Sequence, residues 1–522
     1  MKRWIAVFFA VFSLAAGSVP LFAQLASDPS DRMYTDLQLW EERGIIPRLP
    51  QLRPYPIQLL KELLSEVQQK GDDQDAARAR EYYADMDGAI HIHPGTGLEL
   101  RSDTTSVYGQ YIFGGPFQGS IDPIISYSGY LQGIVNNAAG DSMLPEYVRS
   151  PVDYLTDNAV RSIGGFTPRV SSATSAAIGT DTWYIQAGNT RGSWGPFWGE
   201  NAVLSPSTPQ AAQIAYVFRA ERLTVTEAFF ELGAGNSSGS GWPQPGKFMA
   251  LHGLDLYALP WLTVGMFESI VWGPRFEPLY LLPFSVYYIN EGLVGFPDNS
   301  FIGVNATVRL PEALQFDFVA YFDDMYFSNL IMLDFNTKMK FAAQAGLTWT
   351  PNLPLLSHLA LNVLMVTPYT YSHEDTSGST NYLDYTTDGT NIGPSLQPDS
   401  LRVEIDALMR PVPQVDIQPF ARMILHGNAS SNAPFPDPGD GTIFDNGYVG
   451  NNEAFNTFRF LDQAVIEKTV QVGADAAAYF HLSFGTVKVY GSYTFEYITD
   501  KGLSAGATAL NNYFRVGFFY QY

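Results

Sequence analysis

Apolar side chains alternate with polar or small ones along the last eleven residues of the chain. One face of this segment carries Phe514, Val516, Phe518, Tyr520 and Tyr522, and the other carries Arg515, Gly517 and Gln521. Successive side chains of a β-strand point to opposite faces, so a period of two indicates a strand. The sequence therefore predicts a C-terminal strand with one apolar face.

The same alternation recurs in the body of the chain. Residues 487–497 and 314–323 each place aromatic and aliphatic side chains at every second position. From about residue 90 the chain has room for on the order of 18 strands, at roughly 24 residues per strand and connection. Outer-membrane β-barrels usually have an even number of strands. We expect an all-β fold, a transmembrane antiparallel outer-membrane β-barrel over residues 89–522. A soluble β-sandwich is the alternative.

Residues 24–88 have a different period. Met33, Leu37 and Trp40 recur at helical spacing within residues 31–43, and Gly44 is a stop signal. A second apolar stripe follows Pro56, a favourable first-turn residue, and ends near Gly71. A weaker third helix is expected over residues 72–84. The segment is predicted to be a small periplasmic helical unit, because a solvated linker would not need the two apolar stripes.

The N-terminus resembles an export signal. Lys2 and Arg3 precede an apolar run, and Ala23 is a small residue at the expected cleavage point. We expect residues 1–23 to be a signal peptide. The chain has no cysteine, so it needs no disulfide in an oxidising periplasm.

Charge and hydropathy argue against two features, a nucleic-acid partner and a membrane-spanning helix. Cleavage after residue 23 removes two of the 30 basic residues and none of the 52 acidic ones, which leaves a net charge of −24. Such acidity argues against nucleic acid as a partner. No later stretch has about 18 consecutive apolar residues, as a membrane-spanning helix would need. The nearest, residues 279–289, contains Pro283 and three tyrosines.

Several short motifs, in order along the chain, resemble the capsule-assembly outer-membrane proteins of the Wzi type. The segment Asp-Leu-Gln-Leu-Trp-Glu-Glu-Arg-Gly-Ile-Ile at 36–46, followed by Pro-Tyr-Pro at 54–56, is similar to that family's helical N-terminal segment. Residues 188–196 and 267–275 each contain Trp-Gly-Pro and resemble two further regions of the family. Shorter similarities follow at 298–299, 323–324 and 392–400. Ser193 replaces the usual second tryptophan before the first Gly-Pro.

The resemblance implies a barrel with a periplasmic helical bundle that holds secreted polysaccharide at the cell surface without catalysing a reaction. The expected partners are outer-membrane lipid, surface polysaccharide and, through the C-terminal strand, the barrel-assembly machinery. Both chain ends are expected on the periplasmic side. The alternative function is a porin-type channel for small solutes, since a barrel of this size leaves an aqueous lumen unless loops fill it.

The two Trp-Gly-Pro motifs supply the candidate polysaccharide-binding residues. A tryptophan face can stack on a sugar ring, while neighbouring polar groups hydrogen-bond its hydroxyl or carboxylate groups. The candidates are Asn189, Arg191, Trp194, Glu268, Trp272 and Arg275. The alternative for each is structural: aromatic belts occur in any barrel, and Trp-Gly-Pro can shape an inward-folded loop.

Catalytic and metal chemistry find little support in the sequence. Residues 235–239 match the pattern of a nucleophile elbow, but no helix is predicted to follow. His91 and His93 could share a face of a strand as metal ligands, and several acidic clusters could bind calcium. With no third ligand near the histidines, and with solvated loops as the ordinary role of such clusters, we expect no enzyme, no cofactor and no metal site.

Overall fold

The computed structural model describes most of the chain. The described ranges are residues 26–103, 105–137, 165–235, 244–282, 285–325, 327–332, 339–373, 380–428, 442–444 and 460–522. The predicted signal peptide, residues 1–23, lies outside the described residues, as does most of the elbow-like motif at 235–239.

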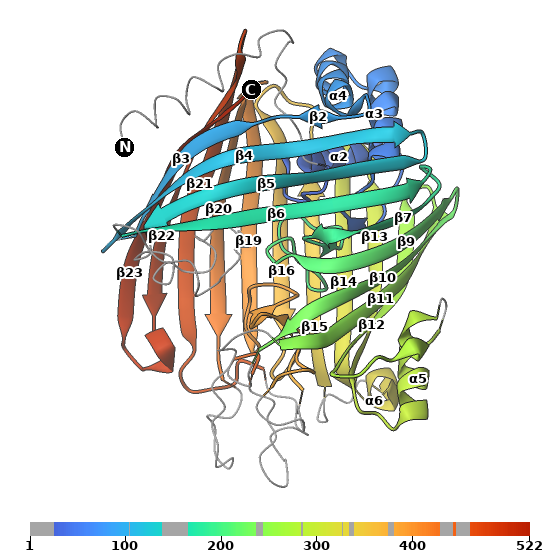
Figure 1. The fold of residues 1–522 in the computed structure, drawn as a ribbon. Helices are drawn as coiled ribbons and strands as arrows, with labels where there is room; N and C mark the ends of the chain where they lie inside the picture. The colour runs from blue at the N-terminus through green and yellow to red at the C-terminus, as the bar shows by residue number, and fades with distance from the viewer. Residues whose placement is uncertain are drawn as a thin grey trace.

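Eighteen antiparallel strands close into a single barrel (Figure 1), which confirms the predicted fold class. The wall consists of β3 (Gly95–Ser102), β4 (Val107–Asp122), β5 (Ile125–Asn137), β6 (Phe166–Gly179), β7 (Trp183–Thr190), β9 (Ala211–Ala220), β10 (Leu223–Ala234), β11 (Gln244–Leu259), β12 (Leu262–Trp272), β13 (Asn299–Leu310), β14 (Leu314–Met325), β15 (Met339–Trp349), β16 (Leu356–Val366), β19 (Ser400–Val412), β20 (Val415–His426), β21 (Glu467–Leu482), β22 (Gly485–Thr499) and β23 (Thr508–Gln521). Short strands outside the barrel order are β1 (Leu52–Arg53), β8 (Ser193–Trp194), β17 (Thr386–Thr387) and β18 (Thr390–Asn391), and β2 (His91–Ile92) adds to β4.

The predicted C-terminal strand closes the barrel. β23 pairs with β3 from Phe514 opposite Ser102 to Gln521 opposite Gly95. Phe514, Val516 and Phe518 point outward and are 52%, 56% and 43% exposed. Closure leaves no strand edge with unpaired backbone groups, which is the condition for a sheet in an apolar solvent.

The two ends of the barrel differ. At one end the strands are joined by short connections, for example 221–222, 413–414 and 483–484, and the C-terminus lies there too. At the other end longer segments join the strands, among them 191–210, 273–298 and 367–399. We call these the turn end and the loop end.

The three predicted helices are present as α2 (Arg32–Glu42), α3 (Ile57–Lys70) and α4 (Asp73–Met86). The side chain of Asp31 accepts from the N–H of Met33, and that of Asp72 caps α4 in the same way. These bonds satisfy backbone donors that the first turn leaves free. α4 extends two residues beyond the predicted end because Met86 is fully buried against the other helices.

The helices close the turn end of the barrel: α2 lies within it, and α3 and α4 stand at its rim (Figure 1). Their apolar cores pack together with Tyr184 and Val217, whose side chains point inward from β7 and β9. Arg32 is bonded to Asp416 of β20 over 2.7 Å, and Asn352 of the β15–β16 turn donates to Asp72 over 3.3 Å. The helical segment thus forms one body with the wall.

The remaining helices are short. They are α5 (Tyr287–Val294), α6 (Phe327–Met332) and the 3₁₀ turns η2 (Pro278–Leu281), η3 (Pro311–Ala313) and η4 (Lys501–Leu503). None of the helices in the described part of the chain is long and apolar enough to cross a membrane.

Candidate functional site

The connection between β7 and β9, residues 191–210, folds into the lumen. Its β8 pairs with β1 of the N-terminal segment, so that Leu52 lies opposite Trp194, and Trp194 also bridges to Leu204. Trp194 is only 2% exposed, and its ring lies 5.9 Å from that of Phe267 on the wall. The first Trp-Gly-Pro motif therefore shapes an inward-folded loop.

A second segment, residues 367–399, packs against the first. The hydroxyls of Tyr371 and Tyr385 donate to the carbonyls of Ala202 and Val203 over 2.6 and 2.8 Å. Both tyrosine rings also lie against Phe301, an inward-facing residue of β13, in tilted orientations, as part of a continuous buried cluster. Together the two segments fill the lumen beside strands β10 to β16.

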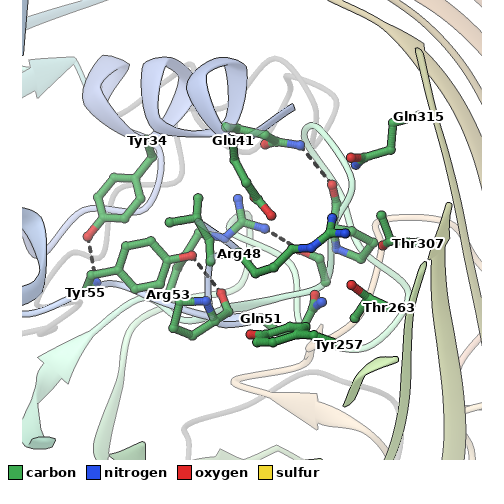
Figure 2. Close-up of a pocket in the computed structure, with 15 residues that line it drawn as sticks. Tyr34, Glu41, Arg48, Gln51, Arg53, Tyr55, Tyr257, Thr263, Thr307 and Gln315 are labelled. Carbon is green, nitrogen blue, oxygen red and sulfur yellow. Dashed lines mark hydrogen bonds between the residues drawn. The ribbon is translucent and has the colours of Figure 1, made fainter. Parts of the chain in front are cut away.

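The N-terminal segment and the first inward loop meet around a small cavity, whose lining is shown in Figure 2. The hydroxyl of Tyr55 donates to the carbonyl of Pro50 over 2.7 Å, and the N–H of Tyr55 donates to the hydroxyl of Tyr34 over 2.8 Å. Gln38 of α2 donates to the carbonyl of Pro196 over 2.8 Å. The cavity that remains here is only about 40 Å³, which suffices for a water molecule but not for a sugar.

The lumen beside β19 to β23 is more open. An upper cavity of about 550 Å³ lies toward the loop end, and a lower one of about 250 Å³ lies below it. Arg422 and Tyr513 line both cavities. The upper volume falls in the ordinary range for small-molecule sites, roughly 300–1,000 Å³.

The inward side chains of β20 show the order of these spaces. From the turn end, Asp416 is held by Arg32 of α2, Gln418 and Phe420 line the lower cavity, and Arg422 is shared between the cavities. Ile424 and His426 line the upper cavity. α2 therefore lies below the cavities, and the loop end lies above them.

Acidic and basic side chains alternate on the wall of the cavities. Arg422 is paired with Glu404 at 3.0 Å, and Arg402 lies 3.5 Å from the same carboxylate. Arg515 is paired with Asp475 at 3.1 Å in the lower cavity.

Neutral donors surround a further carboxylate, that of Glu496. Gln471, Asn511 and Tyr513 each donate to it, over 2.7, 2.8 and 3.1 Å. The Arg422 guanidinium lies over the ring of Phe420 at 4.8 Å. Planar guanidinium groups, carboxylates and amides in one concave wall are groups that hydrogen-bond a hydroxyl-rich ligand.

Burial changes the proton affinity of Asp399, which lies just before β19 at the loop end. Removal from water raises the pKa of Asp399 to about 6, although bonds from the N–H of Leu461 and the amide of Gln463 favour the carboxylate. Asp399 thus fixes residues 461–463 beside the upper cavity.

The six predicted binding residues lie in three different places. Arg191 and Trp194 belong to the inward loop, whereas Asn189 is exposed on the outward face of β7. Glu268 and Trp272 point outward from β12, and Trp272 is 1% exposed beneath Tyr280. Arg275 is paired with Asp298 at 2.8 Å. Both tryptophans have their rings against protein, and sugar contact by the six residues stays a prediction.

The sequence motifs did not indicate the polar lumen wall beside β19 to β23. Its signal was present in the sequence as polar residues at every second position, such as Arg402, Glu404 and Asp406 on β19. In the described part of the chain no group of three or more His, Asp or Glu side chains is arranged to hold a metal ion. His91 instead forms a hydrogen bond with the carbonyl of Asp87, and the ring of His93 lies 2.8 Å from the carboxylate of Asp85.

Comparison with known proteins identifies relatives in fold. No protein-family model matches the sequence, and no curated protein matches it either. Among solved structures, Wzi from Escherichia coli, described as an outer-membrane, carbohydrate-binding β-barrel involved in group 1 capsule assembly, aligns over 95% of this chain and 99% of its own, with a TM-score of 0.55 and 11% identity. OprD from Pseudomonas aeruginosa aligns over 83% of this chain and 95% of its own, with a TM-score of 0.44 and 9% identity. OccD3 from the same organism aligns over 83% of this chain and 91% of its own, with a TM-score of 0.43 and 11% identity. The first likeness shows the fold alone, and the other two scores are too low to carry an argument.

Proposed function

We propose that this chain is an outer-membrane barrel that holds polysaccharide at the cell surface, with residues 24–88 on the periplasmic side. The observation that carries the proposal is the upper cavity, a concave space toward the loop end whose wall combines charged and amide side chains with apolar ones such as Leu396 and Ile424. A plug of helices and inward loops lies below and beside it. A barrel built to pass solutes would keep its lumen clear, whereas here buried aromatic clusters occupy a large part of it.

The outer membrane is supported by the wall itself. Its outward side chains include many exposed aliphatic and aromatic residues, as on β23, while the inward ones are polar or packed against the plug. A closed sheet with an apolar outer band and a polar interior is the arrangement that spans this membrane. The fold of the carbohydrate-binding E. coli barrel agrees with the proposal.

The ligand class follows from the cavity wall. The upper cavity brings Arg402, Arg422 and Lys501 together with Glu467 and Glu496, so neither sign of charge dominates. Such a wall suits a neutral glycan, or an acidic one whose carboxylates reach the arginines. The overall negative charge of the chain works against retention of polyanions by bulk charge alone.

The test is glycan binding by purified protein in detergent or nanodiscs, with a panel of neutral and acidic bacterial exopolysaccharides. Arg422→Gln should weaken binding about 10-fold or more, since a charge-assisted hydrogen bond contributes roughly 1.5–3 kcal/mol. Lys70→Gln on the exposed end of α3 is the control that also removes one positive charge. Large, steady, ion-permeable openings in planar bilayers combined with no glycan binding by the wild-type chain would favour the channel function instead.

A further inference from the structure

The connection between β12 and β13 lies outside the barrel wall, beside β12 at the loop end (Figure 1). It contains η2 and α5. Tyr280 and Tyr287 of this segment pack with Trp272, Ile270 and Ala250, whose side chains point outward from β12 and β11. The segment therefore covers part of the surface that the rest of the wall presents to lipid.

The covered part contains a row of two carboxylates and one imidazole whose neighbours in register on both sides are aliphatic or aromatic. Neighbouring strands place nine outward-facing residues in continuous register. In order they are Ile178, Ile185, Tyr216, Glu227, His252, Glu268, Ile302, Phe322 and Phe341. Only the central three carry a carboxylate or an imidazole, and polar groups facing lipid without partners cost several kcal/mol each, roughly.

Tyr287 at the start of α5 supplies partners for this row. Its N–H donates to Glu268 over 2.8 Å, its hydroxyl donates to Glu227 over 3.0 Å, and its ring lies 4.2 Å from that of His252. The side of the segment that faces the barrel is thus matched to the polar row.

The opposite side of the segment is apolar and exposed. Tyr288, Ile289 and Leu293 are 63%, 61% and 73% exposed. Glu291 is the only charged residue between positions 278 and 297, and it is 3% exposed, with its carboxylate accepting from the N–H of Asp298. An outer surface without charge next to the apolar wall continues that wall.

The height of the apolar band points to the same conclusion. On β23 exposed apolar side chains run from Leu510 to Phe518, whereas on β12 the uncovered ones run only from Leu262 to Met266. At about 3.3 Å per residue these spans are about 26 and 13 Å along the strand. A band about 25 Å tall would therefore extend past Met266 to the level that the segment covers.

We propose that residues 276–282 and 285–296 are embedded in the outer leaflet of the membrane, where their apolar side contacts lipid acyl chains and their inner side shields the Glu227–His252–Glu268 row. This inference rests on the outer-membrane location in the proposed function. The proposed occupant of the exposed apolar side of the segment is lipid acyl chains. The alternatives are a second copy of the protein or bulk water.

Site-directed spin labelling tests the inference, because the chain has no native cysteine. Single cysteines would replace Leu293 on α5, Val516 on the outer face of β23 and Ala505 in the exposed β22–β23 turn, in protein reconstituted into lipid bilayers. Collision of the nitroxide with dissolved oxygen reports lipid, and collision with a water-soluble nickel chelate reports solvent. We expect the Leu293 label to match the Val516 label, with frequent oxygen and rare nickel collisions, and to differ from the Ala505 label.

The three results that would contradict the inference can be told apart. A Leu293 label that behaves like Ala505, while Val516 still reports lipid, would overturn the embedded segment and leave the barrel location intact. A Val516 label in contact with water would overturn the membrane location itself. Dipolar broadening between Leu293 labels, lost on dilution with unlabelled protein, would show a second copy on this surface and would also overturn the lipid contact.

Discussion

The carboxylate of Asp36 on α2 lies 2.6 Å from the guanidinium of Arg410 on the inner face of β19. Arg78 of α4 lies 3.2 Å from the same carboxylate, and the hydroxyl of Tyr82 donates to it over 2.5 Å. Asp36 is 1% exposed. Burial disfavours its ionised form, but Arg410, Arg78 and Arg32 outweigh that effect and hold the pKa of Asp36 well below its usual range. This contact couples the helices to the wall.

Asp36→Asn should therefore loosen the helices in the turn end of the barrel. Removing one partner of a buried ion pair leaves uncompensated charge and costs about 3–5 kcal/mol. Hydrogen–deuterium exchange should rise in α2 and α4 at pH 7, with the strands unchanged. Because the folded pKa is lowered, the wild-type contribution is complete above the unfolded value near 3.9 and fades only at lower pH. Asp73→Asn on the exposed start of α4 is the control, and equal exchange in both variants would contradict the coupling.

Trp194→Ala should destabilise the inward loop and open a path for ions. The ring is buried between the loop and Phe267, and truncation of such a ring costs about 3–5 kcal/mol. Planar bilayers should show low conductance for the wild-type chain and more frequent openings for the variant. Trp183→Ala, which removes a 39% exposed ring from the outer face of β7, should leave the conductance unchanged. Identical traces for Trp194→Ala and wild type would show that this loop does not restrict the current.

Deletion of residues 514–522 should abolish membrane insertion. The deletion removes the pairing partner of β3 and leaves backbone groups unpaired in lipid, at several kcal/mol apiece, roughly. The measurement is the heat-dependent gel mobility of a folded barrel together with membrane fractionation. Arg515→Gln keeps the strand and serves as the control, and normal insertion of the truncated chain would be incompatible with the closed seam.

Asp399→Asn should change how stability depends on pH. Because burial raises the folded pKa to about 6, the folded state binds more protons than the unfolded state between about pH 4 and 6. Wild-type stability should therefore fall as pH rises through that window and stay lower above it, by on the order of 2 kcal/mol. The asparagine variant should lack this loss when urea unfolding is compared at pH 4.5 and 7.5. A parallel fall in both proteins would assign the pH dependence to other groups.

Local patterns were sufficient to predict the elements of the fold. The period of two in residues 514–522 indicated β23, and the stripes around Leu37 and Leu60 indicated α2 and α3, because these faces follow directly from strand and helix geometry. The approximate number of strands followed from chain length. The pairing of β23 with β3 is what closure of the predicted barrel requires.

The positions of the candidate residues could not be read in the same way. The two Trp-Gly-Pro motifs look alike in sequence, yet Trp194 is buried in the lumen and Trp272 is buried on the outer wall beneath Tyr280. Which face a connection covers depends on the path of residues distant in the chain. No local pattern contains that path.

The sequence by itself determined the alternating strands, the amphipathic helices and the negative charge, all of which depend on residues close to one another in the chain. Only the tertiary structure decided that the helices close the turn end of the barrel, that Arg32 meets Asp416, and that Arg422 lines a cavity shared by five strands. The physical reason is that lumen contacts form between groups separated by long stretches of chain. Their energies depend on burial and complementary charge, which arise only once the barrel has closed.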